Sequence, residues 1–178
     1  SKQGHYRYDS AAKTWTQVSA PELGKRSMQG LWGTGPRDVW LPGGRPAHFD
    51  GEHWDTSATM PAGLRDVHGT ARDDVWQVGW LGGNHKDDVG AAFHFDGKVW
   101  TQATLPKDTP LLWSVSAASR TEAYAVGGRG WTLVWDGTDW RGSAAGVTGT
   151  LRTVYSPGGG VAFAGGVIGP YVLRRKSS

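Results

Sequence analysis

The densest group of side chains able to bind a ligand lies between residues 80 and 91, in the segment WLGGNHKDDVGA. An indole ring beside several hydrogen-bonding groups suits a sugar, whereas paired carboxylates with an amide oxygen suit Ca²⁺, which prefers hard oxygen ligands. The residue types favour a solvated loop without a ligand, and a ligand site in this segment is the functional alternative. The predicted binding residues are Trp80, Asn84, His85, Asp87 and Asp88, with Lys86 beside them.

Three arginines occupy related positions in the motifs GPRDVW, TARDDVW and ASRTEAY. Sialidase-like catalysis would need arginines that converge on one carboxylate. A regular placement along the chain instead favours a repeated structural role, in which each arginine pairs with a neighbouring acid. The arginines are Arg37, Arg72 and Arg120, and the acids are Asp38, Asp74 and Glu122. We therefore predict no catalytic residues and no enzymatic activity.

Two histidines, His48 and His94, occupy one position of a repeated pattern, and Val134 and Arg7 fill the same position in other copies. A metal site would require ligands converging from several copies, so this position is interpreted as a packing site. The chain has no cysteine. That composition excludes disulfides, thiolate-bound zinc and the Cys–Tyr cross-link of galactose-oxidase copper chemistry. We expect no cofactor apart from possible Ca²⁺ in the segment 80–91.

These residues lie in a sequence that repeats itself. Taking Met28, Leu64, Leu112 and Leu151 as equivalent gives steps of 36, 48 and 39 residues, and each step contains four short apolar segments. Periods of this length are typical of propellers and solenoids. The strands alternate polar and apolar residues, which favours β-structure over helix. The longest step contains the insertion 80–91, between its second and third strands, and inserted loops on a rigid scaffold commonly carry binding residues.

The third and fourth strands of each unit are joined by an Asp-Gly pair that predicts a two-residue hairpin turn with positive φ. A tryptophan follows four residues after each Asp, where it can cover the strand edge and pack on the next blade. The pairs are Asp50–Gly51, Asp96–Gly97 and Asp136–Gly137, and the tryptophans are Trp54, Trp100 and Trp140, with Trp15 in the same place near the N-terminus.

The fold class predicted is all-β, a β-propeller of four-stranded antiparallel blades. Residues 1–178 form one domain, with closing strands in 1–27, blades in 28–63, 64–110 and 111–150, and the last blade in 151–178. An N-terminal strand that completes the last blade would close a ring of four blades. The count of 17 strands is one more than four closed blades require, so part of a larger propeller is the alternative.

The units, such as LRDVHGTARDDVWQVGW followed by FHFDGKVW, resemble the Trp-rich kelch-like or galactose-oxidase-like propeller repeats of bacterial secreted and surface proteins. They are similar, more weakly, to the Asp-box repeat of sialidase-like propellers. The segment HFDGEHW lacks the leading Ser or Thr of that repeat and has Gly directly after Asp. The resemblance implies an extracellular, periplasmic or cell-surface protein, whose signal is not present in this sequence.

The formal net charge of +3 comes from scattered basic residues, without the basic stripe that a nucleic-acid groove needs. No segment reaches the roughly 18 apolar residues of a membrane span. We therefore predict a non-catalytic binding module, with carbohydrate as the first ligand class (a lectin-like module) and a protein-interaction scaffold as the second. A propeller-type glycoside hydrolase or lyase is the alternative from another functional class.

Overall fold

The computed structural model describes residues 5–24, 29–81, 89–144, 146–167 and 169–174. These residues form 17 strands and two short 3-10 turns, η1 (Pro21–Leu23) and η2 (Gly128–Gly130). In the described ranges, no helix has the length and apolar character needed to cross a membrane.

The strands form five antiparallel sheets. The first is a hairpin of β1 (His5–Asp9) and β2 (Thr14–Val18). The first blade contains β3 (Trp32–Gly35), β4 (Asp38–Leu41), β5 (Ala47–Phe49) and β6 (Trp54–Asp55). The second contains β7 (Ala62–Ala71), β8 (Asp74–Leu81), β9 (Gly90–Phe95) and β10 (Trp100–Gln102). The third contains β11 (Leu112–Ser119), β12 (Glu122–Gly127), β13 (Trp131–Trp135) and β14 (Trp140–Ala144). The last contains β15 (Leu151–Gly158), β16 (Val161–Gly166) and β17 (Gly169–Arg174).

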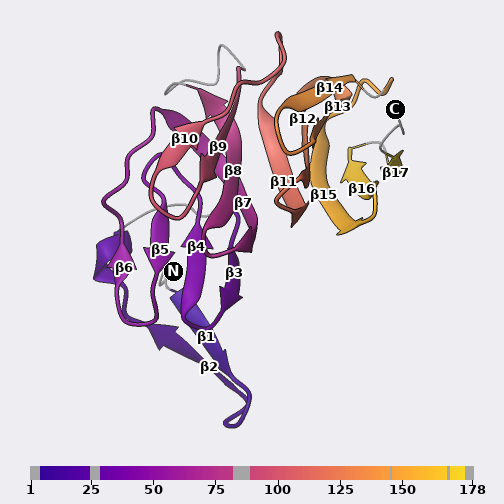
Figure 1. Cartoon of the computed structure of the whole chain (residues 1–178). Coiled ribbons are helices and arrows are strands. Elements are labelled where there is room, and N and C mark those ends of the chain that lie inside the picture. Colours follow the sequence, from indigo (N-terminus) through magenta and orange to yellow (C-terminus); the bar gives the residue numbers. More distant parts are fainter. Residues whose placement is uncertain (1–4, 25–28, 82–88, 145, 168, 175–178) are drawn as a thin grey trace.

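The core lies between neighbouring blades, because alternate residues of each second strand face opposite neighbours. On β8, Val75 belongs to a cluster with Trp40 of the first blade. Trp76 and Val78 belong to the cluster that holds Leu133 of the third blade. A single strand therefore contributes to two interfaces, and the second and third blades are each held by the blades on both sides. Figure 1 shows the four blades following one another across the molecule.

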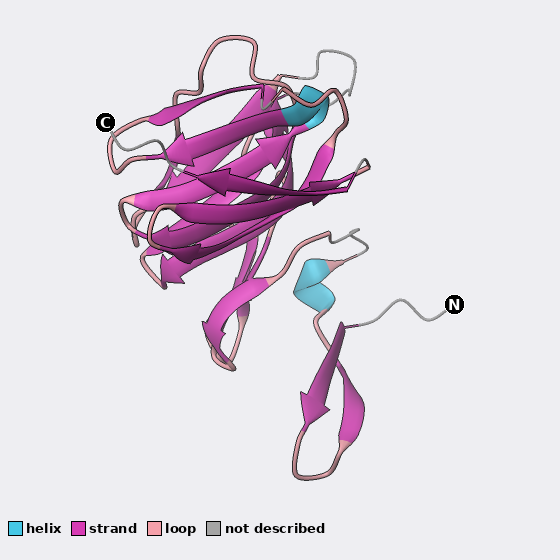
Figure 2. Cartoon of the chain, turned by 90° about the vertical axis from the view of Figure 1, so that its right-hand side faces the viewer, coloured by secondary structure: helices cyan, strands magenta, loops and turns pink. Residues whose placement is uncertain are grey.

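The ring closure expected from the sequence is not formed within the chain. Strands β1 and β2 pair with each other, and the sheet of β15, β16 and β17 has three strands in the described residues. The N-terminal hairpin lies beside the first blade, far from the C-terminal end (Figure 1), and it stands apart from the stacked sheets in Figure 2. The predicted use of the N-terminal strand to complete the last blade is therefore wrong for the single chain. Residues of the hairpin and of the first blade instead line a shared hollow.

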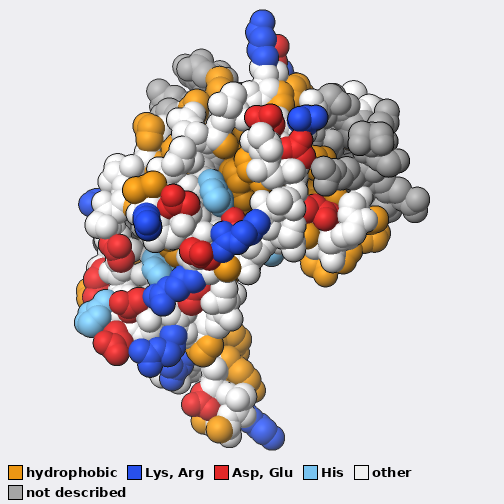
Figure 3. Space-filling model, in the orientation of Figure 1, with side chains coloured by type: hydrophobic (Ala, Val, Ile, Leu, Met, Phe, Trp, Pro, Cys, Tyr) orange, Lys and Arg blue, Asp and Glu red, His pale blue; other side chains and the backbone are white. Residues whose placement is uncertain are grey.

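The surface differs between the two ends of the stack. Figure 3 shows charged side chains gathered over the first two blades and hydrophobic side chains along the hairpin and at the lower end of the last blade.

Candidate binding site

A repeated β-bulge lies near the start of the innermost strand of three blades. In the second blade, Leu64 pairs with Gly79 and Asp66 pairs with Val78, so the intervening residue, Arg65, has no partner in the ladder. The same shift occurs between Leu112 and Ser114 and between Leu151 and Thr153. A bulge turns the side chain of the extra residue away from the regular alternation. The residues re-aimed in this way are Arg65, Trp113 and Arg152.

A glycine on the second strand permits each bulge. A Cβ atom on Gly79 would lie 2.1 Å from the carbonyl oxygen of Gly63, which is closer than real Cβ contacts allow. The inner strand can approach the second strand at this point because Gly79 has no side chain. Gly127 and Gly166 stand at the same place in the third and last blades, where a Cβ would lie 2.5 Å from Leu111 O and 2.2 Å from Thr150 O.

The three side chains stack on one another across neighbouring blades. The guanidinium carbon of Arg65 lies 3.9 Å from the ring centre of Trp113, and that of Arg152 lies 3.8 Å from the same ring. Arg65 Nη1 also donates a hydrogen bond of 2.5 Å to Oε1 of Gln29, which occupies the equivalent position ahead of the first blade. We call these four residues, Gln29, Arg65, Trp113 and Arg152, the Arg–Trp row.

The electrostatics of the Arg–Trp row are unbalanced. Burial is the main cause that lowers the pKa of Arg65, and repulsion from Arg152 lowers it further. Within the part of the chain that the structure describes, neither guanidinium has a carboxylate partner, and Arg65 Nε is buried without a hydrogen bond. Cation–π stacking on Trp113 stabilises each arginine, and the exposed side chain of Arg152 keeps N–H donors that an anion can reach.

No family model matches the sequence, and no curated protein matches it. Solved structures do match. YCF48 bound to a D1 peptide aligns with a TM-score of 0.57 and 17% identity over 85% of this chain and 54% of that chain. YCF48 from Cyanidioschyzon merolae aligns with a TM-score of 0.63 and 11% identity over 91% and 60% of the two chains. The computationally designed Ika4 protein aligns with a TM-score of 0.59 and 13% identity over 84% and 92%.

Together with the stacked four-stranded antiparallel sheets, these alignments decide the architecture. The chain has the β-propeller fold. It spans 54% and 60% of the length of the two YCF48 chains, and at identities of 11–17% the likeness concerns the fold alone.

Only one of the binding residues predicted in the insertion falls among the described residues. Trp80 is half-buried, with its ring 4.7 Å from the guanidinium carbon of Arg65. It packs on Gly63, where a Cβ would lie 2.1 Å from the indole. The structure thus places Trp80 against the Arg–Trp row. Asn84, His85, Lys86, Asp87 and Asp88 lie outside the described residues.

The base of the insertion borders a polar hollow of about 770 Å³ between Leu81, Val89 and the loop that leads to the third blade. Arg129 lines this hollow too. Among the described residues, no group of three or more His, Cys, Asp or Glu side chains is arranged to hold a metal ion. Binding of Ca²⁺ by the insertion stays a prediction.

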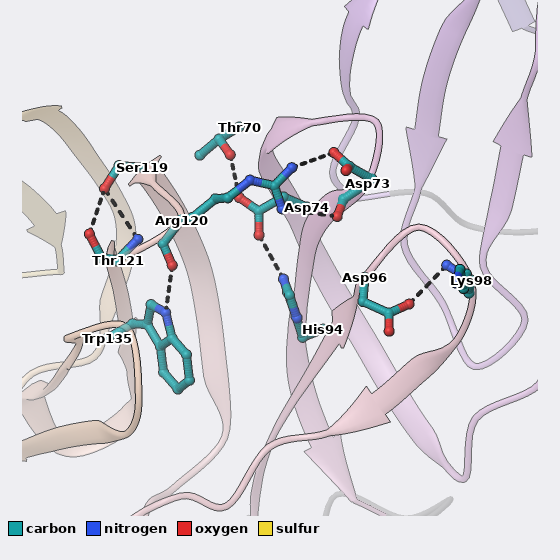
Figure 4. Close-up of polar contacts among 10 residues, drawn as sticks. All are labelled: Thr70, Asp73, Asp74, His94, Asp96, Lys98, Ser119, Arg120, Thr121 and Trp135. Carbon is teal, nitrogen blue, oxygen red and sulfur yellow. Dashed lines mark hydrogen bonds and ion pairs between the residues drawn. The ribbon is translucent and has the colours of Figure 1, made fainter.

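The repeated arginines do not converge on one point. Arg120 reaches back to Asp73 of the preceding blade, with Nη2 and Oδ1 2.5 Å apart (Figure 4). Arg72 likewise approaches Asp38 of the blade before it at 3.7 Å. Arg37 pairs with Glu52 in its own blade at 3.4 Å. Arg72 and Arg120 therefore pair with acids of the preceding blade. The prediction from the sequence, that each arginine pairs with the acid beside it in the chain, is wrong for these two.

The histidines His48 and His94 bind carboxylates within their own blades. His94 Nε2 lies 2.7 Å from Asp74 Oδ1, and the Thr70 hydroxyl donates to the other oxygen of Asp74 (Figure 4). His48 Nε2 lies 2.6 Å from Asp38 Oδ1. Burial alone would raise the pKa of Asp74, but the hydrogen bonds from His94 and Thr70 outweigh burial and lower it. In the third blade, Glu122 occupies the position of Asp74, and its carboxylate accepts hydrogen bonds from Tyr124 Oη and from the Gly160 N–H.

The Asp-Gly pairs form turns of a different kind from the one expected. Glycine has positive φ at all three turns, for example 106° at Gly51, but the aspartates do not. The carboxylate of Asp50 accepts hydrogen bonds from the N–H groups of Glu52 and His53, both at 2.8 Å. Asp96 and Asp136 do the same. A four-residue loop closed by the Asp side chain therefore replaces the two-residue turn.

The tryptophans that follow these turns have different environments. Trp140 is buried, Trp54 and Trp100 are half-buried, and Trp15 is exposed beside Tyr8. Trp100 and Trp140 contact tryptophans of the preceding blade, whereas the sequence interpretation placed them against the next blade.

Proposed function

We propose that this propeller is a non-catalytic binding module that takes an acidic, extended protein segment along the Arg–Trp row. The observation that carries the proposal is the pair of guanidinium groups, from Arg65 and Arg152, stacked on Trp113 without a carboxylate partner among the described residues. Two like charges held together raise the free energy of the unliganded protein, and an anionic ligand would offset that cost.

The residue types determine the ligand chemistry. Arginine presents several N–H donors in a planar fork that fits a carboxylate, and hydrogen bonds between charged groups are stronger than neutral ones. Trp113 lies between the two guanidinium groups and holds them side by side, so its ring faces are already covered. The preferred ligand is therefore a segment rich in Asp or Glu side chains.

An extended segment fits the layout better than a compact anion. The Arg–Trp row takes Arg65, Trp113 and Arg152 from the inner strands of three successive blades and Gln29 from the segment before the first blade, so its polar groups are spread along a line. A YCF48 structure, which shares the fold at low identity, is bound to a D1 peptide. That likeness supports a protein ligand for this fold type and says nothing about its sequence.

Two buried carboxylates of the described residues, which glycosidase-type catalysis could use, are held in structural networks. Asp38 and Asp74 are buried, and each is bound by a histidine and a threonine of its own blade. A glycosidase needs two carboxyl groups that face each other across the substrate. The commitment of Asp38 and Asp74 to structural networks supports a binding module.

The test is fluorescence anisotropy with labelled decapeptide pools of fixed length, in which Asp and Glu are either present or replaced by Asn and Gln. We expect the acidic pools to bind and the amide pools to bind weakly, with affinity falling as salt is raised. The double variant R65Q/R152Q should lose binding to the acidic pools by about tenfold or more, because it removes both charges.

The matched control is R37Q, which removes one exposed cation from the first blade, outside the Arg–Trp row. It should bind like the wild type. Equal binding of acidic and amide pools, or equal binding by R65Q/R152Q and R37Q, would overturn the proposal. A glycan array run on the same proteins covers the carbohydrate prediction. Selective glycan binding that survives R65Q/R152Q, with no acidic-peptide binding, would favour a lectin-like module over this proposal.

A further inference from the structure

Each blade presents two faces, one toward the preceding blade and one toward the next. The face toward the next blade carries a large aromatic residue at one position of the second strand, namely Trp40, Trp76, Tyr124 or Phe163. The first three are buried under the following blade. Phe163, on the last blade, is 48% exposed, and Tyr155 on the adjacent inner strand is 62% exposed.

The face toward the preceding blade shows the reverse pattern. The equivalent positions are Val67, Val115 and Val154 on the inner strands and Leu31 directly before β3. The three valines are buried against the blade before them, whereas Leu31 of the first blade is 69% exposed. The stack therefore ends in an exposed aromatic face on the last blade and an exposed aliphatic face on the first blade. Faces of these two kinds already form an interface within the chain. Tyr124 and Val126 of the third blade already pack on Leu151 and Val154 of the last blade.

A hollow of about 580 Å³ lies on the open face of the first blade. It is lined by Leu31, Val39 and Phe49 of that blade and by Tyr6 and Val18 of the N-terminal hairpin. The hairpin reproduces the outer half of a blade. Its turn is capped by Asp9 as the other turns are capped by their aspartates.

Among the described residues, no strand pairs with the inner edge of β1. The hollow thus lies where the two inner strands of a preceding blade would stand. At the other end, the sheet of the last blade has inner strands and, in the described residues, no fourth strand. Within the described residues, the hairpin supplies two strands and the last blade supplies three, β15, β16 and β17, so the two ends match in apolar character and do not match strand for strand.

We propose that a second copy of this chain covers both faces, with the last blade of one copy docked on the first blade of the other. The face of β15 and β16 then covers the open face of the first blade, and Phe163 packs on Leu31 and Val39 as Tyr124 packs on Val154 within the chain. The interface is head-to-tail, so each copy uses two different surfaces, and a closed ring satisfies both. Docking also brings Arg152 of one copy toward Gln29 of the other, which extends the Arg–Trp row across the junction.

The first test measures mass by light scattering after size exclusion, over a range of concentrations of the whole chain. We expect the wild type to associate, and we expect F163D and L31D each to weaken association by about tenfold or more, because each places a charge in an apolar interface. V99D is the matched control, since Val99 is an exposed valine in the turn between β9 and β10, away from both faces. It should associate like the wild type.

Mixing the two variants separates a head-to-tail interface from a symmetric one. F163D keeps an intact Leu31 face, and L31D keeps an intact Phe163 face, so the mixture should form a 1:1 complex that neither variant forms alone. A wild type that remains monomeric at all concentrations would overturn the proposal. Association that neither variant weakens, or a mixture that stays monomeric, would overturn it as well.

Disulfide cross-linking between two copies tests the same interface without introducing a charge that could prevent folding. The chain has no cysteine, so L31C and F163C introduce the only thiols. Mild oxidation of the mixture should give mainly the mixed disulfide dimer, and oxidation of each variant alone should give little dimer. Equal yields from all three samples would contradict the proposed pairing of Leu31 with Phe163.

Discussion

Trp76 on β8 meets Trp140 on β14 edge to face, with ring centres 5.1 Å apart and ring planes at 85°. Trp40 and Trp100 repeat this relationship between the first and second blades, at 5.8 Å and 79°. The second strand of one blade is thereby joined to the outer strand of the next. Pairs of this geometry add to the stability that comes from burial, so the tryptophan content of the chain serves the interfaces between blades.

Truncating Trp140 should therefore weaken the fold strongly. W140A removes a side chain that is only 4% exposed, and such truncations cost about 3–5 kcal/mol in the free energy of unfolding. Trp15 has the same place in its hairpin but is 69% exposed, so W15A should change the free energy by less than about 0.5 kcal/mol. Urea denaturation followed by circular dichroism measures both. A loss below about 1 kcal/mol for W140A would contradict the packing role.

Acid should loosen the contact between the second and third blades through His68. The Ala117 N–H donates to His68 Nδ1 at 3.1 Å, which requires that nitrogen to be unprotonated. Burial lowers the pKa of His68, and neighbouring Asp66 and a hydrogen bond involving Gly69 oppose that shift without reversing it. The unfolded chain then binds the proton first, so this contribution is complete above about pH 6.5. It is lost as the pH falls toward the folded-state pKa.

The variant H68Q isolates this effect, because glutamine can accept the Ala117 hydrogen bond and does not titrate. Between pH 8 and pH 5, the free energy of unfolding should fall less steeply for H68Q than for the wild type. Parallel pH profiles of the two proteins would show that His68 does not couple blade contact to pH.

Asp74 should matter more for stability than its neighbour Asp73, although both aspartates bind basic side chains. Asp74 is buried and held by His94 and Thr70, and D74N should cost about 1–3 kcal/mol. Asp73 is exposed and paired with Arg120, so D73N should cost less than about 1 kcal/mol.

Because the folded-state pKa of Asp74 is lowered, its contribution to stability is present above about pH 4 and is lost as the pH falls through the folded-state value. The difference in free energy of unfolding between wild type and D74N should become smaller in that pH range. A difference that stays constant with pH would contradict the lowered pKa of Asp74.

The repeat could be predicted from the sequence because its turn and strand signals involve only residues that are close together in the chain. An Asp-Gly pair followed by a tryptophan requires only neighbouring residues, and the alternation of Val75, Trp76, Gln77 and Val78 indicates a strand with two different sides. Pairing across the ends could not be predicted in this way. A count of strands does not say which edges meet, and the hairpin faces the first blade across a shared hollow.

The Arg–Trp row was missed for a related reason. Alternation assigns Arg65, Trp113 and Arg152 to a regular face of the strand, and a bulge redirects each of them. The available signal was the glycine at the same place in each second strand, together with a large polar or aromatic residue directly after the first leucine of each inner strand. Insertion residues drew attention first because inserted loops commonly bind ligands.

That glycine provides the sharpest link between the fold and the proposed site. In G79A, the new Cβ would lie 2.1 Å from Gly63 O and 2.7 Å from the Cα atom of Leu64. The inner strand must shift to relieve these contacts, which should cost about 1–3 kcal/mol and displace Arg65 from Trp113. We therefore expect G79A to bind the acidic peptide pools more weakly even under conditions where it remains folded. Gly35, which has open space around its Cα atom, provides the control G35A, with little change in stability or binding. Unfolding and anisotropy measurements on the two variants test this link. A folded G79A protein that binds the acidic pools as tightly as G35A would show that the bulge does not position the Arg–Trp row.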